Sequence, residues 1–391
     1  MIKRLFDVEL KRHLANFPIV TILGPRQCGK TTLVKSLEPF PLYVDLEKPS
    51  DHDLVAADIE GFLRKNNTPV IFDEANRLPS LFPVLRSLVD ENRINGRIIL
   101  LGSASPSLVK GISESLAGRT SFLDLTPFLW PEVAPPVTEL GLDMLWFRGG
   151  YPSAALISDD TARRDWYDAY LRAFVERDLN ALGVEIDAVA MRRLLQMLAH
   201  GNGGIWNASQ YGASLGLSYN TVNRYVDILE RTFFLRRLFP WFSNAGKRLI
   251  KRPKIYFRDT GLAHYLLGIH SPPVLDVHPA RGASWEAFAI DQLMGVCSVT
   301  LRPQGYYFYR TSTGSEVDLL MEWEGRRIPI EFKLHSAPGN DHLKGMRKVM
   351  KDLGLEKGWV VYPGEKTYSL GNGVTVVGLA RLLAAPTEVL G

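Results

Sequence analysis

The clearest chemical pattern lies near the N-terminus, where eight residues starting at Gly24 fit the pattern GxxxxGK[ST]. An apolar run over 19–23 precedes them and a helical pattern begins at Lys30, which is the context expected of a phosphate-binding loop. In such a loop the backbone N–H groups surround a phosphate, Lys30 reaches the β- and γ-phosphates, and the Thr31 hydroxyl coordinates Mg²⁺. The spacing therefore predicts that this segment binds a nucleotide together with Mg²⁺. The predicted binding residues are Gly24, Pro25, Arg26, Gln27, Cys28, Gly29, Lys30, Thr31 and Thr32.

Two carboxylates follow a second apolar run, which covers 70–72. Asp73 is expected to hold the Mg²⁺ ion through water. Glu74 is placed to polarise the attacking water, and this general-base role separates an NTPase from a passive nucleotide binder. The alternative is a solvated strand end, which the phosphate loop makes the weaker interpretation.

Two further side chains are candidates for the same site. Ser103 follows the apolar run over 98–101, so it is expected at the carboxyl edge of a strand, where ligands bind, and is predicted to sense the γ-phosphate. The alternative role of a helix N-cap suits Ser105 better. Arg119 is a candidate arginine finger, against the alternative of an ordinary surface arginine. A finger supplied by a neighbouring subunit would make the active form a homo-oligomer.

A second group of candidate catalytic residues lies near the C-terminus. Asp318 belongs to a strand-like segment over 316–321, and Glu331 and Lys333 belong to another over 328–333, after a turn at Gly325. Residues two apart in a strand share a face, so two carboxylates and a lysine would converge. Such a group suits a phosphodiesterase that uses Mg²⁺ or Mn²⁺.

The alternative for this second group is a surface hairpin with an ordinary Glu/Lys pair. Against it, Glu331 and Lys333 interrupt an apolar strand, where charged groups are costly to bury. The arrangement resembles the PD-(D/E)xK nuclease superfamily. The resemblance implies that Asp318 and Glu331 hold the metal ion, with Glu286 as the extra acidic residue contributed by a helix.

A helix-turn-helix is predicted over 207–231. Its second helix has Val222, Tyr225, Val226 and Leu229 at offsets 0, 3, 4 and 7, which places them on one face. Segments 233–238 and 254–257 then fit the two strands of a wing. The opposite face of the second helix carries residue types that contact phosphates and base edges, namely Asn220, Thr221, Asn223 and Arg224.

Positive charge is concentrated just after this unit. Between Arg231 and Arg258 there are nine basic residues and no acidic ones, although the chain as a whole carries only +4. We therefore expect contacts with DNA phosphates. The alternatives are a small helical packing unit with solvated cations, or docking of an acidic partner protein or of a neighbouring ATPase subunit. The predicted nucleic-acid contacts are Asn220, Thr221, Arg224, Lys251, Arg252 and Lys254.

Three successive patterns along the chain would position these residues. Short apolar runs alternate with helical patterns up to a proline-rich stretch at 127–136, which predicts an α/β domain with a parallel sheet. A helical region follows, and strand-like segments return after residue 305. We expect a P-loop NTPase domain over 1–135, a helical and winged helix-turn-helix region over 136–260, and an α+β, restriction-endonuclease-like domain over 261–391.

Composition narrows the class of protein. The chain has 391 residues, 46% of them hydrophobic, which is enough for two or three domains with separate cores. Its two cysteines, Cys28 and Cys297, argue against a disulfide scaffold or a zinc site. Charged residues such as Asp7 and Glu9 interrupt the N-terminal segment, and no apolar run approaches ~18 residues. We therefore expect a cytoplasmic protein without membrane insertion.

Taken together, these segments resemble prokaryotic AAA+ family ATPases that join an ATPase domain to a C-terminal domain of unknown function. The resemblance implies ATP binding and hydrolysis, favours Arg119 as an arginine finger and leaves the biological role open. At Asn76 the family often has glutamine, so an amide is retained. The matching segments are 24–32, 72–75, 102–105, 116–119, 125–128, 149–152, 177–178 and 259–262.

The sequence thus predicts an Mg²⁺-dependent ATPase of AAA+ type that acts on or near DNA and has a nuclease-like C-terminal domain, and it leaves open whether that domain cleaves DNA. A different class of protein fits the same residues. It is a nucleotide-switched protein-interaction module whose catalytically silent C-terminal hairpin docks a partner.

Overall fold

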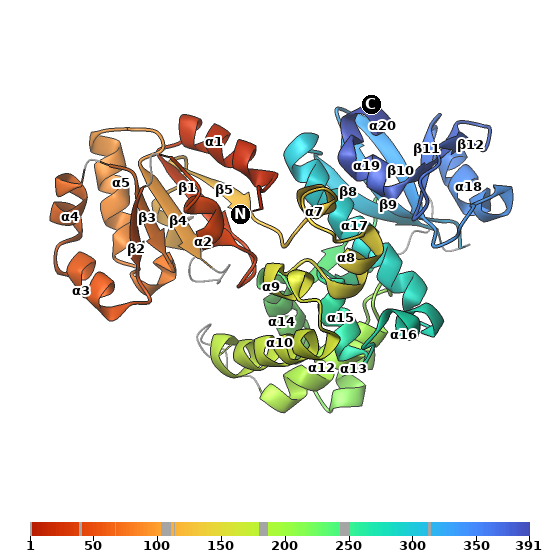
Figure 1. Ribbon diagram of the computed structural model, residues 1–391, viewed down its shortest axis with the longest axis horizontal. Helices are drawn as coiled ribbons and strands as arrows, with labels where there is room; N and C mark the ends of the chain where they lie inside the picture. Colours follow the sequence, from red (N-terminus) through yellow and green to blue (C-terminus); the bar gives the residue numbers. More distant parts are fainter. Residues whose placement is uncertain are drawn as a thin grey trace.

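The computed structural model describes residues 2–38, 41–66, 68–102, 111–112, 114–179, 187–242, 251–311 and 314–391, with the side chains of 341 and 342 left out. Figure 1 shows three modules: an N-terminal α/β module, a helical module below the centre, and a C-terminal module built on a second sheet. Across the described residues, none of the helices combines the length and apolar character needed to cross a membrane.

The N-terminal module is built on a five-stranded, entirely parallel sheet with the strand order β2-β3-β4-β1-β5. Its central strands are buried along their whole length, as their unbroken apolar runs predict for a sheet covered on both faces. The predicted parallel α/β fold is therefore confirmed. The strands are β1 (Ile19–Leu23), β2 (Leu42–Asp45), β3 (Val70–Asp73), β4 (Ile98–Gly102) and β5 (Thr120–Asp124), and the helices are α1 (Phe6–Asn16), α2 (Lys30–Val34), α3 (Pro49–Ala57), α4 (Ile59–Lys65), η1 (Ala75–Arg77) and α5 (Leu81–Glu91).

The helical module contains the predicted pair of helices, α13 (Ala208–Leu215) and α14 (Tyr219–Arg231). Gly216 ends the first helix with φ +68°, a left-handed conformation that favours glycine, and Ser218 caps the second by accepting from the Thr221 amide. Strands β6 (Leu235–Leu238) and β7 (Lys254–Phe257) pair antiparallel where the two wing strands are expected. The other elements are α7 (Trp130–Val133), α8 (Leu142–Arg148), α9 (Pro152–Leu156), α10 (Asp160–Ala173), the π-helical turn η2 (Phe174–Asp178), α12 (Ala188–His200), α15 (Thr260–Leu266) and α16 (Pro272–Val277).

The C-terminal module has a mixed six-stranded sheet with the order β12-β13-β11-β10-β9-β8. Strands β8, β9 and β10, which come first along the chain, form an antiparallel meander. Strands β10, β11 and β13 run parallel to one another. The predicted turn at Gly325 joins β9 to β10 and has φ +73°. The elements are α17 (Arg281–Thr300), β8 (Gly305–Arg310), β9 (Glu316–Trp323), β10 (Arg326–Phe332), η3 (Asn340–Leu343), α18 (Lys344–Leu353), β11 (Gly358–Tyr362), β12 (Tyr368–Ser369), β13 (Val374–Gly378), α19 (Leu379–Ala384) and α20 (Pro386–Leu390).

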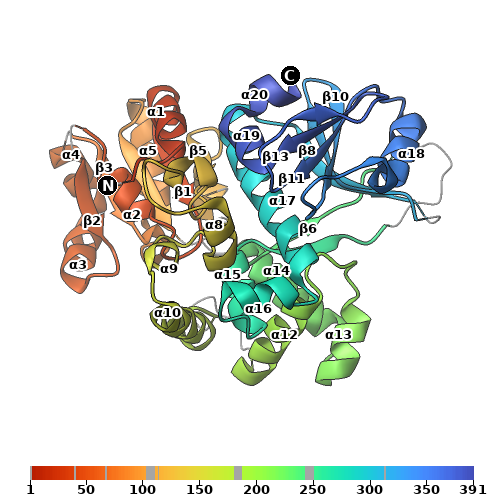
Figure 2. The same cartoon turned by 45° about the vertical axis from the view of Figure 1, so that its right-hand side comes forward.

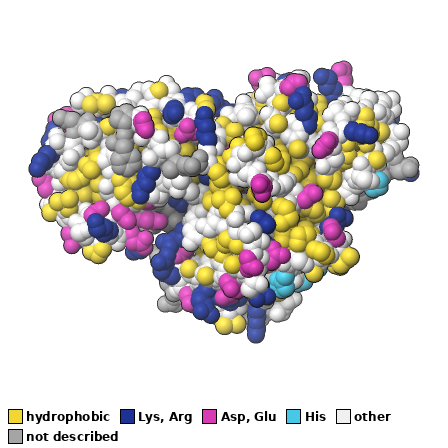
Figure 3. Space-filling model, viewed as in Figure 1, with side chains coloured by type: hydrophobic (Ala, Val, Ile, Leu, Met, Phe, Trp, Pro, Cys, Tyr) yellow, Lys and Arg dark blue, Asp and Glu magenta, His cyan; other side chains and the backbone are white. Residues whose placement is uncertain are grey.

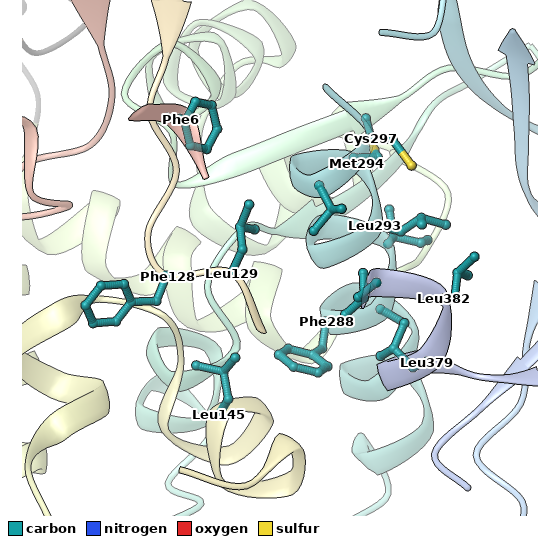
Figure 4. Close-up of a cluster of buried hydrophobic side chains, with 14 of the residues drawn as sticks. Phe6, Phe128, Leu129, Leu145, Phe288, Leu293, Met294, Cys297, Leu379 and Leu382 are labelled. Carbon is teal, nitrogen blue, oxygen red and sulfur yellow. The ribbon is translucent and has the colours of Figure 1, made fainter. Parts of the chain in front are cut away.

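A single apolar core joins the N-terminal and C-terminal modules (Figure 4). Phe128 and Leu129, from the segment that follows β5, lie beside the apolar residues of α17, and that helix runs between the modules (Figure 2). At Gly295 an added Cβ would come within 2.6 Å of the Leu129 side chain, so glycine permits this close approach. The parallel sheet and the C-terminal sheet therefore pack on one continuous apolar core.

Candidate functional site

The phosphate loop lies between β1 and α2, as predicted. Gly24 has φ +158° in a tight position, where any side chain would collide with the carbonyl oxygen of Leu125, and Gly29 has φ +102°. The Lys30 side chain is buried inside the loop, and its ammonium donates to the carbonyl oxygens of Gly24 and Pro25, each at 2.9 Å. The loop backbone therefore holds the lysine within the loop that the sequence predicts to bind phosphate.

The predicted magnesium ligands meet at the carboxyl edge of the sheet. The Thr31 hydroxyl donates to Asp73 Oδ2 at 2.8 Å, so the hydroxyl and the carboxylate face the same point. Tyr43, which the sequence did not single out, donates to the same oxygen at 2.6 Å. Burial and the neighbouring Asp73 raise the pKa of Tyr43, so it remains a neutral donor that orients the carboxylate.

Glu74 lies directly beyond Asp73 in an uncommon backbone conformation. Its φ of +50° is left-handed, a region that non-glycine residues seldom adopt. Burial raises the pKa of the Glu74 carboxyl, while the charges of Lys30 and Arg26 act in the opposite direction. The carboxyl group is therefore close to the phosphate loop and partly withdrawn from water, which suits a base.

A cavity of about 510 Å³ opens beside the same loop. Gly29, Thr32 and Leu33 line one side of it, and Pro152 and Leu156 of the helical module line another. Most of its exposed lining is apolar, and its volume falls in the range of small-molecule sites. A ligand in this cavity would touch both modules.

Arg4 is a buried residue that sequence reasoning missed. Its guanidinium donates to the carbonyl oxygens of Cys28 (2.9 Å), Thr126 (2.7 Å) and Pro127 (3.2 Å), and it pairs with Glu132 at 3.0 Å. It therefore fixes the phosphate loop to the segment that leads out of β5. Its partners lie more than 120 residues away, except Cys28, so no local pattern identifies them.

A second unforeseen contact links the loop to the helical module. Arg26 pairs with Asp178 at 3.2 Å, and Arg177 contacts the same carboxylate oxygen at 3.3 Å. Both Arg177 and Asp178 belong to the π-helical turn η2, a kind of turn often found at functional sites. Segment 177–178, recognised in the sequence without a role, therefore lies against the nucleotide loop.

The structure does not bring Arg119 to this site. Arg119 precedes β5, at the sheet edge opposite the carboxyl ends of the strands, and forms a bidentate ion pair with Asp90 at 2.6 and 2.7 Å. It is too remote to serve the nucleotide site of its own chain, so a finger role would require a neighbouring subunit. Ser103 and Ser105 lie outside the described residues.

The second predicted group comes together from three elements. Glu286 projects from α17, Asp318 from β9 and Glu331 from β10, with Lys333 directly after β10. Lys333 pairs with Glu331 at 2.6 Å, and Asp318 accepts from the Phe332 amide at 2.9 Å. Burial, then the charges of Glu286 and Glu331, raises the pKa of Asp318 well above its usual value.

Lys254 belongs to this cluster and not to a nucleic-acid surface, which corrects its predicted role. The residue is only 4% exposed, and its ammonium lies 2.7 Å from Glu316, 3.1 Å from Glu286 and 3.9 Å from Asp318. Burial alone would lower the pKa of Lys254, but Glu286, Asp318 and Glu316 raise it above its usual value. A lysine held in this way cannot reach a phosphate backbone.

Internal pairing also removes much of the predicted basic surface. Arg236 and Arg258 share Asp291, at 2.7 and 3.4 Å, and Arg237 binds Glu230 at 2.6 Å. On the face drawn in Figure 3, Lys and Arg side chains lie scattered among acidic ones. Asn223 accepts from the Trp206 indole, and Lys247 and Arg248 lie outside the described residues. The exposed remainder of the predicted surface is Asn220, Arg224, Arg231, Lys251 and Arg252, with Thr221 half-buried.

Within the described part of the chain, no group of three or more His, Cys, Asp and Glu side chains is arranged to hold a metal ion. The Thr31 and Asp73 pair needs no such group, because phosphate oxygens and water complete the coordination of Mg²⁺ at nucleotide sites. At the C-terminal cluster, the ammonium of Lys254 lies among the carboxylates.

Comparison with known proteins assigns each module to a family model. Residues 16–134 match an AAA domain, 139–272 match a domain of unknown function (DUF8612) and 281–382 match another (DUF4143). The chain is 40% identical over 378 residues to the uncharacterized proteins Mb2031c of Mycobacterium bovis and Rv2008c of Mycobacterium tuberculosis, covering 96% of this chain and 83% of each relative.

Two solved structures illustrate the partial structural similarity of this chain to known proteins. The Walker-type ATPase PABY2304 of Pyrococcus abyssi is 15% identical with a TM-score of 0.49, over 68% of this chain and 96% of that chain. The RuvB protein of Thermotoga maritima is 18% identical with a TM-score of 0.32, over 68% of this chain and 94% of that chain.

Proposed function

The chain belongs to the same family as Rv2008c and Mb2031c and carries an AAA-type P-loop ATPase domain, and from this premise we propose that it binds and hydrolyses ATP with Mg²⁺. The observation that carries the proposal is the convergence of Lys30, Thr31, Asp73 and Glu74 at one edge of the parallel sheet. Lys30 and Thr31 begin α2, whereas Asp73 ends β3 and Glu74 follows it, and each has the chemistry that phosphoryl transfer needs.

Each residue has a separate role in the proposed reaction. Lys30 moves from the loop carbonyls to the β- and γ-phosphates. Thr31 and Asp73 hold Mg²⁺, which when bound neutralises charge on the phosphates, and Tyr43 keeps the Asp73 carboxylate oriented. Glu74 accepts a proton from the water that attacks the γ-phosphate.

The cavity beside the loop is proposed to take the adenine base and ribose. Gly29, Thr32 and Leu33 line the cavity, so it adjoins the loop proposed to hold the phosphates, and its apolar character suits a base. Pro152 and Leu156 contribute from the helical module, so the nucleotide would bridge the two modules.

Replacing Leu156 with Ala tests this placement. Leu156 is 51% exposed, so the substitution removes apolar contact area from the cavity without opening the core. We expect the Kd for ATP to rise about threefold to tenfold, as partial loss of a leucine contact implies. The measurement is a titration with a fluorescent ATP analogue. Val137→Ala, at 56% exposure and away from the cavity, should leave the Kd unchanged; equal values for both variants would place the base elsewhere.

A second candidate function is metal-dependent cleavage of phosphodiester bonds by the C-terminal module, with Mg²⁺ or Mn²⁺. The observation that favours it is the meeting of Glu286, Asp318, Glu331 and Lys333, which lie on three elements separated by up to 47 residues of chain. Asp318 and Glu331 would hold the metal ion, Glu286 would add a third carboxylate, and Lys333 would stabilise developing charge.

The second function predicts cleavage of labelled single- or double-stranded DNA that is lost in Asp318→Asn. The assay compares Mg²⁺ with Mn²⁺, each with and without ATP, and Glu365→Ala serves as an exposed acidic control. If neither the wild type nor the variant cuts while ATP is hydrolysed, the C-terminal module is a platform that docks a partner protein.

DNA is the proposed partner of the helix-turn-helix unit, through a smaller surface than the sequence suggested. Asn220, Thr221 and Arg224 on α14 and the exposed Lys251 and Arg252 before β7 form this surface. Arg236 and Arg258 are neutralised by Asp291, and Arg237 is neutralised by Glu230. We therefore expect few contacts with DNA phosphates and a moderate affinity for DNA.

Replacing Lys251 and Arg252 together with Ala should weaken DNA binding and lower the slope of log K against log salt by about 2. Fluorescence anisotropy at several salt concentrations measures both quantities. Lys65→Ala with Arg86→Ala, an equal loss of exposed charge on the N-terminal module, is the matched control. The same slope in all proteins would exclude Lys251 and Arg252 as contacts and favour docking of a protein partner.

We propose a homo-oligomer only because Arg119 could act as an arginine finger in a neighbouring copy of the chain. The bidentate pair with Asp90 would have to open for Arg119 to enter the nucleotide site of a neighbouring chain. We propose that the protein acts in the cytoplasm.

A further inference from the structure

The ammonium of Lys254 lies where a cation would bind in the C-terminal acidic cluster. Three carboxylates surround it: Glu316 at 2.7 Å, Glu286 at 3.1 Å and Asp318 at 3.9 Å. These carboxylates come from β9 and α17 of the C-terminal module, whereas the lysine comes from β7 of the hairpin that follows the helix-turn-helix. The cluster is therefore filled from a neighbouring module.

The cluster retains capacity to bind more than the lysine. Glu331 is only 8% exposed, and its Oε1 pairs with Lys333, but its Oε2 is buried and accepts no hydrogen bond from the described residues. A buried carboxylate oxygen without a donor is costly, and a cation would satisfy it. This oxygen is a second indication of a cation site, separate from the number of acidic residues.

The ammonium of Lys254 and a divalent metal ion would compete for Glu286 and Asp318. Mg²⁺ needs carboxylate oxygens at about 2.1 Å, so Glu286 and Asp318 would have to move inward over the place that the ammonium fills. Two positive charges in a buried site also repel each other strongly. A divalent ion held by Glu286 and Asp318 together with Glu331 therefore requires the ammonium to move away.

From this arrangement we infer that Lys254 is a built-in cation that excludes divalent metal from the C-terminal acidic cluster, and that displacement of β7 opens the site. The inference rests on the proposed metal-dependent function of that cluster and assigns its regulation. Strand β7, which begins with Lys254, pairs with β6. The backbone of Lys254 also forms a β-bridge with Ile205 in the helical module. Movement of the helical module, which contacts the phosphate loop through Asp178, would therefore move the ammonium.

The test is Mn²⁺ binding by the full, nucleotide-free chain, measured by electron paramagnetic resonance. Lys254→Met removes the charge and keeps a long unbranched side chain, so we expect Mn²⁺ affinity at least about tenfold above wild type. Lys254→Arg keeps the charge and should behave like the wild type. Adding Asp318→Asn to Lys254→Met should abolish the gain, which assigns the new site to the cluster and not to Thr31 and Asp73.

Loss of the lysine also leaves neighbouring carboxylates unpaired. For this reason the double variant Lys254→Met with Glu316→Gln is measured in parallel. ATP binding by each variant serves as the check on folding. Equal Mn²⁺ affinity in wild type and in both charge-removed variants would overturn the inference. Because metal binding is measured without cleavage, a gain in binding with no DNA cut would support the role of Lys254 while rejecting the nuclease function.

Discussion

Replacing Lys30 with Ala is expected to reduce ATP turnover at least about a hundredfold, the cost of removing one strong donor to developing charge. The ammonium is buried in the phosphate loop and bonded to the carbonyls of Gly24 and Pro25, so no other described cation can take its position without rearranging the loop. Steady-state phosphate release at saturating ATP and Mg²⁺ measures the effect.

The matched control for this prediction is Lys48→Ala, which removes an exposed lysine of the same module. It should retain full turnover. Thermal denaturation shows whether the Lys30 variant is folded, because the removed ammonium also bridges two loop carbonyls. A folded Lys30 variant that hydrolyses ATP at the wild-type rate would contradict the ATPase assignment.

Local spacing was sufficient to predict the phosphate loop and its carboxylates. The loop is contiguous, and Asp73 follows an apolar strand, so the parallel sheet brings both to one edge without further information. Tyr43 and Arg4 were missed, and segment 177–178 was recognised without a role, for the opposite reason. Tyr43, Arg4 and Asp178 reach the site through contacts between residues 24 to 152 positions apart, and no local spacing reveals such contacts.

Counting charge along the chain was misleading for a related reason. Arg236, Arg258 and Lys254 lie in a stretch without acidic residues, yet each is neutralised by a carboxylate from α17 or β9. A run of cations predicts a positive surface only if no other segment folds against it. Of these carboxylates, Glu286 belongs to the predicted C-terminal acidic group, whereas Asp291 was not singled out, and only the fold brings either of them to the basic stretch.

The same fold brings the predicted C-terminal residues Asp318, Glu331 and Lys333 close together. Alternation in β9 and β10 gave the shared face of Asp318 and Glu331, because a hairpin with a turn at Gly325 leaves little choice of register. The position of Glu286 depends on the packing of α17 against β10, which sequence periodicity does not determine.

Glu74→Gln is expected to keep ATP binding within about twofold of wild type and to lower kcat by about a hundredfold to ten-thousandfold, the range for loss of a general base. Glutamine has the same length and the same Cβ, so the left-handed backbone at φ +50° is strained equally in both proteins. The substitution therefore removes the basic oxygen and changes little else. Parallel measurements of ATP affinity and single-turnover hydrolysis separate binding from chemistry.

The pH dependence gives this prediction an independent readout. Burial raises the pKa of the Glu74 carboxyl above its ordinary value, and only the ionised form can accept a proton from water. Wild-type kcat should therefore fall as the pH is lowered, beginning at a higher pH than for an ordinary glutamate. The residual rate of the Gln variant should lack this acidic limb. If the variant loses ATP binding and turnover in equal measure, or if both proteins show the same acidic limb, Glu74 supports the loop and a different group activates the water.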